Sequence, residues 1–501
     1  MVAALFLTSL RDNGRLAARF CSAPVLRLPV LLLWVAVFGG SLHAPCTTFF
    51  YLSVGASQEQ VGNISAIISV VSMLTVPLYG HFIDATAGAL EAVAAAGFCC
   101  ALGCAVRAAA LSVAWLYAGS LVLGFGAASL LPSVLSHLSS HCAPDEKPKV
   151  VAAVAFQTSL LRLVGKSLYP PTVAVLAAAG ASLELQYRVM MGVCPFFCVA
   201  GWVALSLRRK RSALAPVPPP PTPTSLAPAP ELAPPLKQEV GAAKGGQSGG
   251  ASAWPPVFVA TAAAIAATAA ARQSGAVLWP LYLRDGFEWG AAQFAGALLA
   301  ENLASIGALF FLPRVAQHYG AAAVAVGGLA SAAACAALAF RLRSPPMHVA
   351  CMVCLLSGLS LLDAHLRALG ALSAPPSLQG EPSLREAPGP RSAEASLTVG
   401  RVLTGRAFAY LSVLSSLGTA VGSLATHLYA AHATAALLPA AVALASSALL
   451  LLPFQGALAP APGVAADGKE RCEAEWPDEG GGVDERAALL RTKATVRVFT
   501  E

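Results

Sequence analysis

Charged residues are scarce in this sequence of 501 residues and make up only 11% of the chain, against about 25% in soluble domains. A surface that faces water needs charge, so this shortage excludes a string of soluble globular domains. Hydrophobic residues reach 56% of the chain, and the mean hydropathy is +0.67. The composition therefore predicts an all-α protein that crosses a membrane several times.

Motifs for catalysis, metal binding and nucleotide binding are also missing. Cys351 and Cys354 form a CxxC, but no second CxxC or histidine pair follows at the spacing of a zinc site. No GxxxxGK[ST] loop is present, so ATP does not drive the protein directly, and no HExxH or pair of acids lies at membrane depth. The net charge of +7 forms no basic stripe. We expect no enzyme activity, no cofactor, no metal and no nucleic-acid partner.

Twelve apolar stretches are long enough for a membrane-spanning helix, which needs about 20 residues. They lie at approximately 28–52, 60–82, 88–107, 113–137, 150–178, 188–207, 254–282, 289–312, 319–340, 346–369, 400–428 and 433–454. The segment between the sixth and the seventh stretch is rich in Pro, Ala and Gly and cannot bury a core. The pattern predicts twelve transmembrane helices in two halves of six.

The predicted domain order follows from these stretches. An N-terminal segment (1–27) precedes the first six-helix bundle (28–207), a linker (208–253) and the second six-helix bundle (254–454). The second bundle contains a Pro/Ser-rich loop (374–398), and residues 455–501 form a polar tail.

Lysine and arginine in the short loops predict the orientation. One set of loops holds the Arg208–Arg211 run and several other basic residues, whereas the opposite set holds one or two per loop, among them Arg107 and Arg188. By the positive-inside rule, both termini, the linker and the 374–398 loop are cytoplasmic. The arginines of residues 1–23 fit either a cytoplasmic lead-in or a transit peptide. The run from Glu485 to Leu490 resembles an acidic dileucine signal, so the protein is expected in the plasma membrane or in a vacuolar or endolysosomal membrane.

A short loop after the second stretch carries Gly80, Asp84 and Gly88. This loop resembles the signature of the major facilitator superfamily, G-x-x-x-D-(R/K)-x-G-(R/K)-(R/K). Gly80 and Asp84 match in type and spacing, Gly88 stands one place late, and the basic positions do not match. The fourth stretch, with Gly124 and Gly126, is similar to the pattern of that family's fourth span.

The resemblance implies a monomeric secondary transporter of a small organic solute, with two pseudo-symmetric halves that alternate access to a midplane site. A second interpretation stays open, in which the chain is a membrane sensor or scaffold that keeps the fold without transporting. By resemblance, the loop of Gly80, Asp84 and Gly88 would gate the halves, with Asp84 as a latch. Asp84 would otherwise cap the third span.

A few charged residues lie inside the predicted spans, where charge is costly and usually faces a cavity or a partner. The candidates for substrate binding or ion coupling are Arg162, Lys166, Arg272, Glu301 and Asn302, with Arg406 nearer the cytoplasm. In facilitator-like folds, the spans that hold them contribute to the central cavity.

The three cationic residues at this depth, Arg162, Lys166 and Arg272, favour an anionic solute. Glu301 would carry a coupling proton, because burial disfavours a carboxylate charge. The alternative is a static pair of Glu301 with Arg162 or Arg272 that only fixes the packing. Asp363 is predicted to lie at the cytoplasmic end of span ten, within reach of water.

Overall fold

The computed structural model describes residues 14, 15, 18, 20, 24–86, 89–140, 147–214, 254–373 and 405–454. The regular elements within these residues are helices, and no strand occurs among them. The first group is α2 (Pro24–His43), η1 (Ala44–Cys46), α3 (Thr47–Ser53), α4 (Gln58–Thr86), α5 (Ala89–Ala108), α6 (Val113–Ser140), α7 (Lys147–Ala178) and α8 (Leu183–Leu214).

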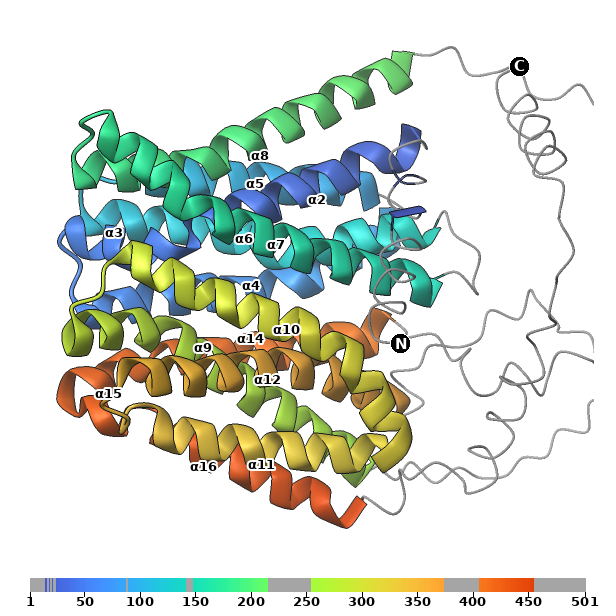
Figure 1. Ribbon diagram of the computed structural model, residues 1–501. Coiled ribbons are helices and arrows are strands. Elements are labelled where there is room, and N and C mark those ends of the chain that lie inside the picture. Colours follow the sequence, from blue (N-terminus) through green and yellow to red (C-terminus); the bar gives the residue numbers. More distant parts are fainter. Residues whose placement is uncertain are drawn as a thin grey trace, which may run out of the picture. The chain divides into compact units, whose positions relative to one another are not determined.

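The second group follows the linker. It is α9 (Pro256–Phe287), α10 (Ala291–Tyr319), α11 (Ala321–Ala339), α12 (Pro345–Leu372), α14 (Gly405–Ser423), α15 (Ala425–Ala431), η3 (Ala433–Ala435), α16 (Leu438–Leu451) and η4 (Leu452–Phe454). Proline stands in the first turns of α9 and α12, where its missing N–H costs no hydrogen bond and its fixed φ suits a helix start. In Figure 1 the two groups run from blue to green and from yellow-green to red.

Ten of the described helices or helix groups are long and apolar enough to cross a membrane. The other two long helices are α7, with 32 residues, and α10, with 29. Both lie within the length range of the ten, and each carries charged residues away from its ends, among them Lys166 and Glu301. Counted with the ten, they would make up the twelve predicted helices; the described helices confirm an all-α, multi-pass membrane fold.

The contacts between helices repeat from one half to the other. In the first half, α2 contacts α7 and α8, α4 contacts α6, and α5 contacts α6 and α8. The second half repeats these pairs with the helix six spans later: α9 contacts α14 and α16, α10 contacts α12, and α11 contacts α12 and α16. This repetition is the pseudo-symmetry predicted from the sequence.

The interface between the halves has the same symmetry. The second helix of each half packs on the fifth helix of the other, so that α4 contacts α14 and α10 contacts α7. The two halves, which the predicted linker after the sixth helix joins, thus meet along two equivalent helix pairs. The second of these pairs, α7 with α10, is the one that carries charge at membrane depth.

Close packing inside the second half depends on two glycines of α14. A Cβ at Gly418 would overlap the carbonyl oxygen of Ala266, and one at Gly422 would overlap that of Ala270. Both carbonyls belong to α9, so these glycines let the two backbones meet, as small residues do in membrane helix pairs.

The Gly418→Val substitution is therefore expected to lower the free energy of unfolding by about 1–3 kcal/mol, the usual cost of overpacking. The measurement is thermal unfolding of the purified protein in detergent. Gly358→Val on α12 is the control, because a Cβ at Gly358 meets no atom within 4 Å. Equal melting temperatures for the two variants would contradict the packing role of Gly418.

Candidate functional site

An ion pair joins the two halves near the middle of their spans. Lys166 of α7 donates from Nζ to Oε2 of Glu301 in α10, at 3.0 Å. The side chains are 13% and 12% exposed, so water screens the pair only weakly. Ser305, one turn further along α10, donates to the other carboxylate oxygen at 3.4 Å. The structure thus places two of the sequence-predicted residues in direct contact.

Arg162 lies one turn before Lys166 on the same helix. Its side chain is exposed, although it is close enough to Glu301 and Arg272 of the other half to interact with both electrostatically. The sequence offered Arg162 or Arg272 as the partner of Glu301, but the structure pairs Glu301 with Lys166. Lys166 lies about 6 Å further along the helix axis than Arg162. At this position its ammonium group contacts the Glu301 carboxylate.

Asn302, the next residue of α10, is the fifth predicted site residue. It is 8% exposed, and its Nδ2 has no hydrogen-bond partner among the described residues. An unpartnered buried amide costs roughly 1–3 kcal/mol, so this group is free to donate a hydrogen bond to a solute or a water molecule.

Arg272 belongs to a second charged group, on α9 and α12. Its Nη1 lies 3.9 Å from Oδ2 of Asp363, and Asp363 also accepts two 3.1 Å hydrogen bonds from Arg367. Arg367 in turn donates to Ser412 of α14 at 3.3 Å. The sequence placed Asp363 near water, but only 14% of its side chain is exposed.

The predicted gating loop lies largely outside the described residues. Gly80 is described within α4, and a Cβ there would meet nothing within 4 Å. The side chains of Asp84 and Arg406 and the whole of Gly88 lie outside the described part of the chain. The gating role of Gly80, Asp84 and Gly88 stays a prediction.

The halves also meet at the opposite end of α4, through polar contacts that the sequence did not predict. We name this group the closing cluster; its members are Gln58, Glu59, Asn63, Asp285, His427 and Tyr429. Across the halves, Gln58 donates to Asp285 at 3.0 Å and His427 lies 3.0 Å from Oδ1 of Asn63. His427 also lies 3.7 Å from Glu59. The signal in the sequence was weak, because polar residues at span ends are common.

The sequence model of the family described as the Major Facilitator Superfamily matches residues 30–383 of this chain. This range is 354 of the 501 residues, or more than two thirds of the chain. Comparison with curated proteins finds no match.

Solved structures of transporters share the fold. The human organic anion transporter MFSD10 (TETRAN) is 15% identical, with a TM-score of 0.55 over 86% of this chain and 100% of that chain. The nucleoside transporter NupG is 11% identical, with a TM-score of 0.51 over 86% and 97%. A bacterial homologue of the human lysosomal transporter Spinster is 12% identical, with a TM-score of 0.53 over 91% and 98%.

Proposed function

Because this chain belongs to the Major Facilitator Superfamily, we propose that it is a secondary transporter of a small organic solute that works by alternating access. The two halves rock about their shared interface, and the solute binds between them near midplane. A proton gradient supplies the energy through Glu301. The protein works as a monomer, since both halves of the site come from one chain.

The Lys166–Glu301 pair is the observation that carries this proposal. Ionisable residues inside a membrane are costly and usually mark a transport pathway. This pair is a salt bridge between α7 and α10, two helices that must separate if the halves rock. Protonation of Glu301 would remove its charge and release Lys166, so that the pair opens and closes with the transport cycle.

The charges around the pair favour an anionic solute. Four cationic side chains face two acidic ones in this region: Arg162, Lys166, Arg272 and Arg367 against Glu301 and Asp363. The balance is four minus two, or +2. Arg162 is exposed beside Glu301, and its planar guanidinium suits a carboxylate or phosphate group. MFSD10 is described as an organic anion transporter, but the preference for an anionic solute proposed here rests on these side chains.

The closing cluster supports alternation at one end of the site. Each exposed hydrogen bond or ion pair contributes only about 1 kcal/mol, so a few such contacts hold an end closed and still let it open. We place the termini, the linker (208–253), the 374–398 loop and the tail in the cytoplasm, and the closing cluster on the opposite side. The described contacts then correspond to a state that is closed outside, in a plasma or vacuolar/endolysosomal membrane.

The experiment is solute uptake by the purified protein in lipid vesicles, with and without a pH gradient. The solutes are dicarboxylates, phosphate esters and cationic drugs, and protein-free vesicles are the control. Uptake of a carboxylate or phosphate ester above the control is the expected result. No uptake of any solute, together with solute-induced stabilisation in detergent, would favour the non-transporting sensor instead.

A further inference from the structure

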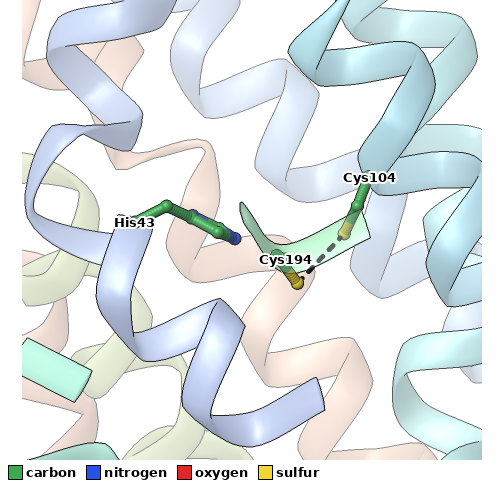
Figure 2. Close-up of side chains that lie close together, drawn as sticks. All are labelled: His43, Cys104 and Cys194. Atoms are coloured by element: carbon green, nitrogen blue, oxygen red, sulfur yellow. Dashed lines mark hydrogen bonds between the residues drawn. The ribbon is translucent and has the colours of Figure 1, made fainter. Parts of the chain in front are cut away.

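Three metal-ligating side chains meet inside the first half, on helices that do not carry the Lys166–Glu301 pair. His43 ends α2, Cys104 lies in α5 and Cys194 lies in α8. One ligand atom of each lies within 4.8 Å of the others. All three are buried, at 8%, 6% and 3% exposed. Figure 2 shows the imidazole ring of His43 pointing toward Cys194, which also faces Cys104.

The distances between the cysteine sulfurs match those of two sulfurs bound to one metal ion. Sγ of Cys194 lies 3.8 Å from Sγ of Cys104 and 4.0 Å from that of Cys198. Metal–sulfur bonds of about 2.3 Å at tetrahedral to trigonal angles hold two sulfurs about 3.8–4.0 Å apart. An ion can therefore bridge the sulfurs of Cys104 and Cys194 at their present separation.

The hydrogen bonds of His43 leave its Nε2 free to bind a metal ion. Thr47 Oγ1 donates to the carbonyl oxygen of His43 at 3.0 Å. Since its proton is used there, Thr47 Oγ1 can only accept from His43 Nδ1, at 3.0 Å. This fixes the proton on Nδ1 and leaves the Nε2 lone pair for a metal, as an outer partner does in known histidine sites.

The charge of the surroundings selects the ion. Arg107 interacts electrostatically with both His43 and Cys104, and it is held in place by Tyr51, to which it donates a hydrogen bond and over whose ring it lies. Two thiolates and one copper(I) carry a net charge of −1, which Arg107 neutralises. Zinc(II) with the same ligands would leave an unbalanced +1, which is costly in a buried site.

We propose that His43, Cys104 and Cys194 form a binding site for copper(I), a soft ion that prefers thiolate and imidazole ligands. The site ties α2, α5 and α8 together within one half. It is separate from the transport site, because no member lies on α7, α9 or α10. Binding releases the two thiol protons to solvent.

The test is copper(I) titration of the full-length protein in detergent under reducing conditions, in competition with the chromophoric chelator bicinchoninate. We expect one tightly held equivalent in the wild type. The Cys104→Ser/Cys194→Ser variant should lose it, and Cys335→Ser/Cys351→Ser in the second half should keep it. Thr47→Val keeps every ligand and should weaken binding by about 10–100-fold through the outer hydrogen bond alone.

Several results would overturn the proposal. One is a wild type without a tight equivalent, and another is equal copper(I) binding by the Cys104→Ser/Cys194→Ser variant. Tight zinc(II) binding that copper(I) does not displace would overturn the choice of ion. Thr47→Val also guards against misfolding, because it leaves both thiols in place and keeps the side-chain volume. A wild-type affinity in this variant would contradict the orientation of the His43 ring by Thr47.

Discussion

Lys166→Met is expected to lower the free energy of unfolding by about 3–5 kcal/mol, because it leaves the Glu301 carboxylate buried without its partner. The same change should reduce solute uptake by at least about 100-fold, since intramembrane charges of this kind are functional by default. The stability measurement is thermal unfolding in detergent. The control is Glu184→Gln, which breaks an exposed ion pair with Arg188 within one helix and should cost about 1 kcal/mol or less.

The double variant Lys166→Met/Glu301→Gln separates the two roles of the pair. Replacing a buried ion pair by uncharged residues of similar volume is often neutral or stabilising, so the double variant should regain wild-type stability. If Glu301 carries the coupling proton, uptake should stay low and lose its dependence on pH. A double variant that regains both stability and pH-dependent uptake would identify the pair as static packing.

Gly62→Leu is expected to prevent closure of the halves at the closing cluster. A Cβ at Gly62 would overlap Thr426 Oγ1 and the carbonyl oxygen of Ser423, across the contact of α4 with α14 and α15. Any larger side chain must push these helices apart, and a few kcal/mol of differential strain moves a two-state equilibrium almost completely. Uptake should then fall by about 10-fold or more, because a cycle needs both states.

The measurement is the extent of disulfide formation in the double variant Asn63→Cys/His427→Cys. The native side chains at these positions lie 3.0 Å apart. A protease site inserted in the 208–253 linker lets a gel show whether the halves stay joined after cleavage. We expect joining with Gly62 present and little joining with Gly62→Leu. Gly296→Leu on α10 is the matched control, because a Cβ there meets no atom within 4 Å. Equal joining in both variants would contradict closure at Gly62.

The sequence predicted the fold well, since spanning length and apolar composition are local properties. The resemblance of the loop around Gly80 and Asp84 then predicted the family, which the match over residues 30–383 confirms. Charge scarcity also singled out Lys166 and Glu301, which lie in contact.

What the sequence could not predict was which residues meet across the bundle. Glu301 pairs with Lys166 and not with Arg162 or Arg272, because a rise of one turn decides the partner. Arg107 looks like a loop charge that reports orientation, yet it is 4% exposed and lies over Tyr51. Helix packing between distant segments sets both outcomes, and a single sequence carries no direct signal of it.

The initial rate of solute uptake against an imposed pH gradient tests the central claim most directly. Wild-type protein in vesicles should take up the identified solute several-fold faster with the gradient than without it. The Glu301→Gln variant should show the same rate under both conditions. An unchanged response to the gradient in Glu301→Gln would contradict proton coupling through this residue.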